Sequence, residues 1–271
     1  MRKFTAPALL FIFLFTGVAS AGTVILTGSC STPNPQNSTF LFNLSNSGND
    51  SAINLAIIPH ISGATPSNSS YEISSLPPGS NTTISIRVSN ITEKGAHTAV
   101  LTSDYEQGSS HFSAIFPCLL YFSNRTTSQI EIAVYPSSLQ DGNSEITVTA
   151  FNAGSNSIRA NLSLALPPVF NYTGTSYPLD LAPNAYENVT FQVSLLPSSL
   201  GGMYSTYGAA AFASYSIGNS SYATMRTFSI NPATQSAYGG GSIIFIAAAI
   251  AVFAVAALTL FSILRKKRRR G

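Results

Sequence analysis

The sequence is short of charge, tryptophan and cysteine. Of its 271 residues only 8% are charged, none is tryptophan and two are cysteine. A typical soluble protein is about one quarter charged, so this chain must take its surface polarity from Ser, Thr and Asn. The three histidines are scattered, and no Cys or His pair has the short spacing of a zinc site. We therefore expect no metal site and no cofactor.

The few basic residues lie mostly at the two ends of the chain. Eight of the thirteen are Arg2, Lys3 and the run Arg265–Arg270. The remaining five share the interval 22–241 with all ten Asp and Glu, which gives the body a net charge of −5. A nucleic-acid-binding surface needs clustered Lys and Arg. The composition therefore excludes nucleic acid as a partner of the body.

Residues 1–21 have the layout of a secretory signal peptide. A basic start precedes an apolar run centred on Leu9–Phe15, and Ala19-Ser20-Ala21 supplies small residues for cleavage. The apolar run is too short to span a bilayer comfortably. We expect cleavage before Gly22 and export of the body, and an uncleaved N-terminal anchor is the alternative.

A second apolar segment lies near the C-terminus. Ile243–Leu264 carries no charge over 22 residues, and as a helix it would be about 33 Å long, which matches a hydrocarbon core. Six consecutive Lys and Arg follow, and the positive-inside rule places them in the cytoplasm. The sequence predicts a Gly-rich linker (233–241), one transmembrane helix (242–264) and a basic cytoplasmic tail (265–271), so that the body faces outward.

Asn-x-Ser/Thr sequons are roughly twice as frequent as chance would give. Eleven of the nineteen Asn residues begin one, and none lies in either terminal segment. This set agrees with export, so we expect N-glycosylation of the body; solubilisation of a charge-poor surface is the alternative. The sequon residues are Asn37, Asn43, Asn49, Asn68, Asn81, Asn90, Asn124, Asn161, Asn171, Asn188 and Asn219.

Three sequons lie in segments where apolar and polar residues alternate. In 40–44 the apolar set Phe40, Phe42 and Leu44 occupies the even positions and Asn43 an odd one, and Asn161 and Asn188 have the same relation to their apolar neighbours. Successive side chains of a strand point to opposite faces. The alternation therefore predicts that these three asparagines lie on solvent faces.

Cys30 and Cys118 are the only cysteines. In an exported chain two cysteines most simply pair, and this pair would join the first and last strands of the first half. Its contribution to stability would be about 4 kcal/mol on the chain-entropy model. Free thiols or a lipid-modified Cys30 are the alternatives, although LTGSC is a poor lipid-attachment signal.

The segment LPPGSNTTISIRVS (76–89) recurs as LAPNAYENVTFQVS (181–194), at an offset of 105. Two further landmarks recur in the same order at similar offsets, which indicates an internal duplication of a unit of about a hundred residues. These landmarks are Asn46-x-Gly48 with Asn152-x-Gly154, and Tyr105–Gly108 with Tyr215–Gly218.

Each landmark is typical of a turn beside a strand. Asn-x-Gly predicts a hairpin or connecting turn in which Gly takes positive φ. Pro78-Gly79 and Pro183-Asn184 predict a second turn before a half-buried strand. Short strands separated by turn signals predict an antiparallel sandwich. We place strands near 23–28, 39–45, 52–58, 70–75, 82–89, 97–104 and 110–122, then near 129–135, 144–151, 158–165, 186–194, 203–216 and 222–230.

This pattern of turns and strand phase resembles the immunoglobulin-like surface repeats of bacteria and archaea, notably the cell-adhesion-related CARDB type. The resemblance covers about 39–122 and 144–230, and Asn184 stands where the usual Gly would be. It implies a spacer, stalk or adhesion module, and a prokaryotic, more specifically archaeal, source. The triple glycine 239–241, the apolar segment and the basic end are also similar to Gly-Gly type sorting signals of prokaryotic surface proteins, at which a protease cuts.

No catalytic signature is found, and we expect no enzyme. The nucleophile elbow, HExxH and P-loop patterns are absent. A hydrolase built on His111, with Ser109 or Ser110 and with Asp104 behind it, is the alternative, because triads are spatial. The segment Asp141–Glu145 lacks the acidic run of a calcium loop and is typical of a turn entering a strand.

Tyrosines are frequent in the second half, above all in YSTYGAAAFASYS (204–216). Tyr is favoured at interfaces because it offers rigid area with a polar tip, but it is also a good strand residue that packs against a core. The candidate binding face consists of Tyr204, Tyr207, Tyr215 and Tyr222.

The sequence thus predicts an all-β fold of two tandem immunoglobulin-like antiparallel β-sandwich domains followed by a single transmembrane helix. The predicted units are the signal peptide (1–21), the first domain (22–125), the second domain (126–232), the linker, the helix and the tail. The predicted role is that of a single-pass type I cell-surface glycoprotein in adhesion, envelope structure or display of a binding face, with a protein or glycan partner. An exported ligand-binding or accessory subunit of a membrane complex is the alternative.

Overall fold

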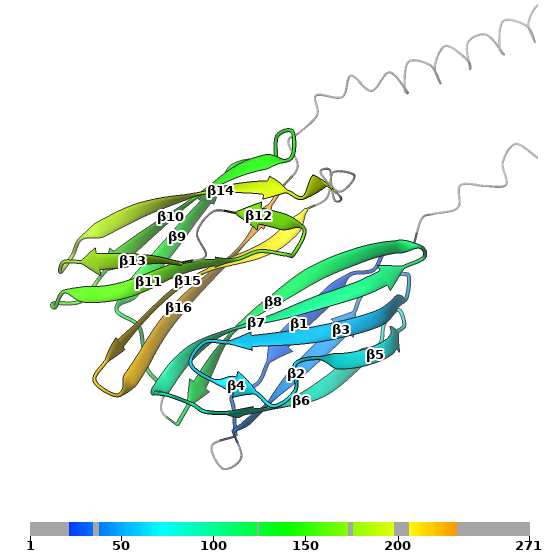
Figure 1. Ribbon diagram of the computed structural model, residues 1–271, viewed down its shortest axis with the longest axis horizontal. Helices are drawn as coiled ribbons and strands as arrows, with labels where there is room; N and C mark the ends of the chain where they lie inside the picture. Colours follow the sequence, from blue (N-terminus) through cyan, green and yellow to red (C-terminus); the bar gives the residue numbers. More distant parts are fainter. Residues whose placement is uncertain (1–21, 35–37, 124, 173–175, 198–205, 232–271) are drawn as a thin grey trace, which may run out of the picture. The chain divides into compact units, whose positions relative to one another are not determined.

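The computed structural model describes residues 22–34, 38–123, 125–172, 176–197 and 206–231. These residues form sixteen β-strands and no α-helix. Figure 1 shows β1–β8 gathered in one sandwich and β9–β16 in a second. The chain is therefore all-β over its described residues, as the sequence predicts.

The first sandwich consists of two four-stranded sheets. One has the order β1-β2-β6-β4, and in the other β8, β7, β3 and β5 lie side by side. Their facing surfaces enclose a core that includes Phe40, Phe42, Leu55 and Leu101, all fully buried. The strands are β1 (Leu26–Cys30), β2 (Thr39–Asn46), β3 (Ala52–Ile61), β4 (Thr65–Pro66), β5 (Tyr71–Leu76), β6 (Asn81–Ser89), β7 (Lys94–Gln107) and β8 (Ser110–Phe122).

The second sandwich repeats this arrangement. Its sheets have the orders β12-β14-β10-β9 and β13-β11-β15-β16, and its core includes Ile146, Val148, Leu162 and Phe191. The strands are β9 (Ile130–Pro136), β10 (Asn143–Asn152), β11 (Ile158–Ala165), β12 (Phe170–Tyr172), β13 (Ser176–Leu181), β14 (Tyr186–Leu195), β15 (Tyr207–Ile217) and β16 (Ser220–Ile230).

The same strand order in both sandwiches is that of an immunoglobulin-like fold. The first, second and sixth strands of each set share one sheet, and the third, fifth, seventh and eighth share the other. In immunoglobulin terms these are an A-B-E sheet and a C′-C-F-G sheet. The alternation of side chains explains why each sheet packs on one face only: β6 reads NTTISIRVS, and its isoleucines and valine are buried while the residues between them are exposed.

The Asn-x-Gly landmark of the first sandwich is built around a buried amide. The side chain of Asn46 is 1% exposed. Its Nδ2 donates to the carbonyl oxygens of Asp50 (2.7 Å) and Leu76 (2.9 Å). Its Oδ1 accepts from the Gly48 N–H (3.0 Å). The amide thus ties the loop after β2 to the end of β5.

Asn152 does the same in the second sandwich, and it is 0% exposed. Its Nδ2 donates to the carbonyl oxygens of Asn156 (2.8 Å) and Leu181 (3.1 Å). Its Oδ1 accepts from the Gly154 N–H (2.9 Å). In each copy, the side-chain amide of the Asn-x-Gly landmark thus donates a hydrogen bond to the leucine carbonyl of the Leu-x-Pro landmark. These two landmarks therefore form one structural junction in each sandwich.

The prediction that the glycines of Asn-x-Gly take positive φ is wrong. Neither Gly48 nor Gly154 lies in the left-handed region. A Cβ at Gly48 would meet the carbonyl oxygen of Thr23, and a Cβ at Gly154 would meet the side-chain oxygen of Gln129. At Gly48 the close approach of the Thr23 backbone requires glycine, whereas at Gly154 the neighbour is the end of the flexible Gln129 side chain, which can move aside.

The second turn is confirmed. Gly79 (φ 69°) and Asn184 (φ 56°) occupy the same left-handed position, which Asn tolerates better than most residues. Their N–H groups donate to the carbonyl oxygens of Asn46 (2.8 Å) and Asn152 (2.9 Å), respectively. Asn184 therefore replaces glycine without changing the turn.

Three short strands are absent from the sequence prediction: β4, β12 and β13. Each lies at the edge of a sheet. β4 and β13 contain Pro66 and Pro178, which argue against a strand in a sequence pattern. Pairing with the long neighbouring strands, which the sequence does not reveal, makes these segments extended.

The two sandwiches pair through a short parallel bridge between β7 and β16, at Lys94–Gly95 and Ser220–Ser221. The Ser221 hydroxyl donates to the Ala96 carbonyl oxygen (2.8 Å), and the Thr126 hydroxyl donates to the Ser221 carbonyl oxygen (2.8 Å). The chain divides by contacts into residues 1–232 and 233–271, so both sandwiches belong to one compact unit. The predicted domain boundary at residues 125 and 126 stays a prediction.

The predicted signal peptide (1–21), linker (233–241), transmembrane helix (242–264) and basic tail (265–271) lie outside the described residues. Within the described ranges, no helix has the length and apolar character needed to cross a membrane.

Candidate functional site

The sequon asparagines share one structural property, exposure to solvent. All nine that the structure describes are exposed, and Asn37 and Asn124 lie outside the described residues. The alternation predicted for Asn43, Asn161 and Asn188 is confirmed, because their apolar neighbours are inside and the asparagines are outside. The nine are Asn43, Asn49, Asn68, Asn81, Asn90, Asn161, Asn171, Asn188 and Asn219.

A cross-strand hydrogen bond fixes the carboxamide of one sequon in each A-B-E sheet. In the first sandwich the Thr83 hydroxyl on β6 donates to Oδ1 of Asn43 on β2 (2.8 Å). In the second sandwich the Thr149 hydroxyl on β10 donates to Oδ1 of Asn188 on β14 (2.6 Å). The offsets of 105 and 106 make these pairs equivalent with the strands exchanged: Thr149 is the copy of Asn43, and Asn188 is the copy of Thr83. Both sandwiches therefore carry a sequon in the same cross-strand pair, but on opposite strands of that pair.

One sheet carries no sequon asparagine on its strands. Asn43 and Asn81 lie on the A-B-E sheet of the first sandwich, and Asn171 and Asn188 lie on that of the second. Asn161 lies on the C′-C-F-G sheet of the second sandwich. Strands β3, β5, β7 and β8 contain none. We call the outer surface of these four strands the sequon-free face; around Val100 and Ile115 it is covered by Ala165, Ala210 and Phe212 of the second sandwich.

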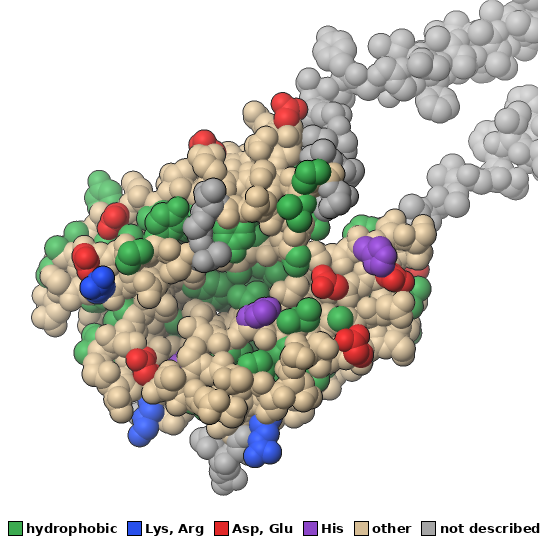
Figure 2. Space-filling view, in the orientation of Figure 1, with side chains coloured by type: hydrophobic (Ala, Val, Ile, Leu, Met, Phe, Trp, Pro, Cys, Tyr) green, Lys and Arg blue, Asp and Glu red, His purple; other side chains and the backbone are tan. Residues whose placement is uncertain are grey.

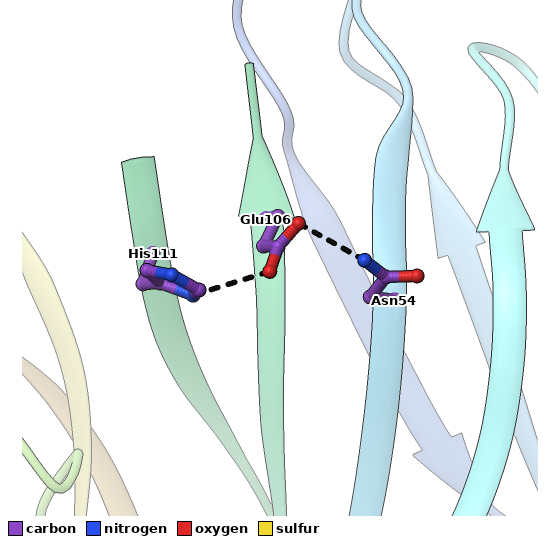
Figure 3. Close-up of polar contacts among 3 residues, drawn as sticks. All are labelled: Asn54, Glu106 and His111. Carbon is purple, nitrogen blue, oxygen red and sulfur yellow. Dashed lines mark hydrogen bonds and ion pairs between the residues drawn. The ribbon is translucent and has the colours of Figure 1, made fainter. Parts of the chain in front are cut away.

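A polar group lies at one end of the sequon-free face (Figure 3). Glu106 on β7 lies between two neighbours: its Oε2 accepts from Nδ2 of Asn54 on β3 (3.0 Å), and its Oε1 lies 3.6 Å from Nδ1 of His111 on β8. His111 is largely exposed. Asp104 lies opposite Ser113 in the register, whereas His111 lies opposite Glu106. The carboxylate that contacts His111 is thus Glu106, whereas the hydrolase alternative places Asp104 behind it; that alternative stays a prediction.

Burial raises the pKa of the Asp104 carboxyl above its ordinary value. Beside it, the rings of Tyr105 and Phe112 stack with centroids 5.7 Å apart, and Phe112 is partly exposed at the strand end. Acidic residues outnumber basic ones on the strands of this face: Glu72, Asp104 and Glu106 stand against Lys94. On the face of the molecule drawn in Figure 2, Lys and Arg side chains appear singly rather than in a basic cluster.

An open groove of about 860 Å³ adjoins the sequon-free face. Ile58–Ser62 of β3 and the loop after it, Thr98 and Val100 of β7, and the segment Ser163–Ala165 with Phe212 line it. Its lining mixes hydroxyl groups with aliphatic side chains. Such a groove offers area and hydrogen-bonding groups for a small or extended ligand.

The histidines have separate environments. His60 lines the groove. His97 is buried, and its ring nitrogens lie 2.8 Å and 2.9 Å from the carbonyl oxygens of Ser62 and Glu93, so it ties two loops to β7. Among the described residues, no group of three His, Cys, Asp or Glu side chains is placed to hold a metal ion.

The candidate tyrosine face is largely part of the second core. Tyr215 is buried, and its hydroxyl accepts from the Gln129 N–H (2.8 Å). Tyr207 and Tyr222 are half-buried and pack against the core, and Tyr222 stacks on Tyr215 with centroids 5.0 Å apart. Tyr204 lies outside the described residues. The alternation of small residues and tyrosines therefore reflects packing at these three positions.

Cys30 and Cys118 form a disulfide, as the sequence predicts. It joins β1 of one sheet to β8 of the other and so closes the first sandwich across its core. The Asp141–Glu145 segment is the predicted turn: Asp141 (φ 50°) and Gly142 (φ 80°) form a two-residue connection closed by backbone hydrogen bonds between Gln140 and Asn143.

No family model matches the chain, and no curated protein matches it. Among solved structures, the chain is similar to trypsin-activated alpha-2-macroglobulin from Escherichia coli, with a TM-score of 0.31 and 9% identity over 78% of this chain and 18% of that one. It is also similar to the YadV chaperone (TM-score 0.30, 8% identity, 76% of this chain and 99% of that one). A third is the CupB2 chaperone of Pseudomonas aeruginosa (TM-score 0.29, 9% identity, 77% and 100%).

The chain spans about a fifth of the macroglobulin and nearly all of each chaperone. These likenesses assign no family, and the resemblance to CARDB-type repeats stays a prediction. The described residues establish an all-β immunoglobulin-like sandwich fold closed by an inter-sheet disulfide.

Proposed function

We propose that this chain is a membrane-anchored, N-glycosylated cell-surface protein whose sandwich body stands outside the cell and acts in adhesion, envelope structure or display of a binding face. One observation carries the proposal. All nine described sequon asparagines are exposed, whereas the two buried asparagines, Asn46 and Asn152, begin no sequon. Asparagines outside sequons are exposed at six further positions, so the informative fact is that no described sequon asparagine is buried and all nine are accessible for a glycan.

Three further features support export. The Cys30–Cys118 disulfide belongs to oxidising compartments. The first 21 residues have the pattern of a cleaved signal peptide, and residues 242–264 followed by the basic tail have that of a single anchor with the body outside. The proposal includes no catalytic step by the protein itself.

The sequon-free face is the binding face in this proposal. A glycan is bulky and strongly solvated, so a partner docks most closely where none is carried. Asp104 and Glu106 at one end of this face favour a partner surface of positive charge. The partner class is a protein or a glycan of the cell surface.

A second candidate is an exported ligand-binding or accessory subunit of a membrane complex. The groove of about 860 Å³ beside the sequon-free face favours it, because a spacer has no use for a groove of that size. A third course, cleavage near the glycines 239–241, would release the body from its anchor.

Treatment of intact cells with an external protease, followed by peptide mass spectrometry, tests the orientation. The proposal expects peptides of 22–231 to be released from intact cells. Peptides of a tag placed after Gly271 should be released only after lysis, and this tag is the matched internal control. Protection of the body until the cells are lysed would contradict the proposal.

A further inference from the structure

In the folded sheets, two sequons have both the asparagine carboxamide and the hydroxyl two residues later engaged in hydrogen bonds to neighbouring strands. A sequon is defined by a carboxamide and by a hydroxyl two residues later, so a transferase must reach both. For Asn43, Oδ1 accepts from Thr83, and the Ser45 hydroxyl lies 2.7 Å from that of Thr27. The sequon therefore has its amide engaged with β6 and its hydroxyl engaged with β1.

The Asn188 sequon is closed in the same way. Its Oδ1 accepts from Thr149 (2.6 Å), and the hydroxyl of Thr190 lies 3.0 Å from that of Thr147. Both partners lie on β10. The two copies thus close equivalent sequons with different residues.

The backbone of these sequons is also engaged. β2 lies between β1 and β6, whereas β14 pairs with β10 along the Asn188 sequon and with β12 only at Val193–Leu195. Asn43 pairs with Ser29 on one side and Thr83 on the other, and Asn188 pairs with Thr149. A transferase cannot bind the Asn43 segment along either edge unless β2 leaves its sheet, and the edge of the Asn188 segment that pairs with β10 is closed in the same way. Release of either strand from its sheet costs a large part of the stability of the domain.

We propose that the oligosaccharide is transferred to Asn43 and Asn188 before their sheets form, and that folding then closes both sequons to the transferase. This order of events rests on the proposed glycosylation of the body. In the transfer step, Nδ2 of the asparagine attacks the anomeric carbon of a lipid-phosphate-linked oligosaccharide. The carbon–oxygen bond to the phosphate breaks, a carbon–nitrogen bond forms, the lipid phosphate leaves with the bonding electrons, and one amide proton passes to a base or to solvent.

The folded sheets can retain the modified residues. The cross-strand bonds of Asn43 and Asn188 use Oδ1, whereas the sugar is attached to Nδ2. The exposed side chain leaves the sugar in solvent. The threonine hydroxyls therefore keep their acceptors after the transfer, and glycosylation is compatible with the observed register.

Asn68 provides the contrast within the same molecule. It is exposed in the connection between β4 and β5 and belongs to no strand. The hydroxyl of its sequon, on Ser70, donates only to the neighbouring Glu72 side chain (3.1 Å) at an exposed position. This sequon stays open to a transferase after folding.

The test uses full-length chain made in a host without N-glycosylation, folded with its disulfide closed, and short synthetic peptides containing each of the three sequons. Both are incubated with membranes of the source cell, which supply the transferase and the lipid-linked donor, and the modified fraction at each site is measured by mass spectrometry. For each sample we take the modified fraction at Asn43 or Asn188 divided by that at Asn68. We expect this ratio to be at least about 100-fold lower in the folded chain than in the peptides, because strand opening is rare.

Equal relative modification of the three sites in folded chain and peptides would overturn the order of events while leaving the proposed glycosylation intact. Absence of modification at Asn68 and in all peptides would overturn the proposed glycosylation, and the inference with it. As a further check, Asn46→Ala weakens the first sandwich, so it should raise the modification of Asn43 more than that of Asn188. An equal rise at both sites, or none at Asn43, would contradict closure by folding.

Discussion

Replacement of Asn46 by alanine should lower the free energy of unfolding by about 3 kcal/mol, because it leaves buried polar groups without partners. The side chain makes four hydrogen bonds, to the carbonyl oxygens of Asp50 and Leu76 and from the N–H groups of Gly48 and Ile25. The bond to Leu76 is buried, and the other three are partly buried. Loss of a buried partner costs about 1–3 kcal/mol, and partial access of water reduces the cost at the other three groups. Urea unfolding followed by circular dichroism measures the sum.

Asn152→Ala is the matched experiment in the second sandwich. It should cost a similar amount, because Asn152 also makes four hydrogen bonds: three correspond to those of Asn46, and the fourth goes to the Ala182 carbonyl oxygen. Asn156→Ala is the control. Asn156 is exposed, and only its backbone carbonyl accepts from Asn152, so its change should stay within about 0.5 kcal/mol. A loss below about 1 kcal/mol for both buried asparagines would refute the claim that these amides hold the junctions.

Three further predictions concern the first sandwich. Replacing Cys30 and Cys118 by serine removes a cross-link that spans 88 residues. The free energy of unfolding should fall by about 4–5 kcal/mol on the chain-entropy model. An unchanged urea midpoint would contradict a closed disulfide. Burial raises the pKa of Asp104, so the folded state keeps its proton to a higher pH than the unfolded state, and stability should fall as the pH rises from the ordinary carboxyl range through the raised pKa. Asp104→Asn should flatten this dependence in urea midpoints measured across that range, and an unaltered slope would show that the carboxyl is not responsible. His111→Asn completes a new sequon with Ser113 on the sequon-free face. Its binding to whole cells or envelope fragments should fall below that of His111→Gln, which loses the same imidazole but adds no sequon. Equal binding by the glycosylated His111→Asn variant and by His111→Gln would place the partner elsewhere.

Alternation and turn chemistry were sufficient to predict most of the fold. The apolar residues of β2, β11 and β14 face inward as the pattern indicates, and the two landmark turns at Gly79 and Asn184 have the expected backbone. These features depend on residues close together in the chain. Edge strand β13 was not predicted, because Pro178 weakens its pattern and its partner β11 is distant in sequence.

Contacts between distant residues explain the other differences. Asn46 reads as a turn residue in the sequence, but its function depends on the carbonyl of Leu76, 30 residues away. The sequence leaves open whether Tyr215 is an interface residue or packs against a core, and in the structure it is buried, with its hydroxyl bonded to Gln129, 86 residues away. The pairing of Asn43 with Thr83 likewise requires the register of two strands. Composition and spacing reveal the sequons, whereas only the sheets show which of them folding closes.

Site-resolved mass spectrometry of the protein purified from its source tests the central claim most directly. The proposal predicts a mature N-terminus at Gly22 and oligosaccharide on the exposed sequons, including Asn43 and Asn188. Variants with Asn43→Gln or Asn188→Gln cannot carry the oligosaccharide at the changed site, so they serve as controls for assigning the mass shift to that site. Unmodified asparagine at all nine described sequons would contradict a glycosylated surface protein.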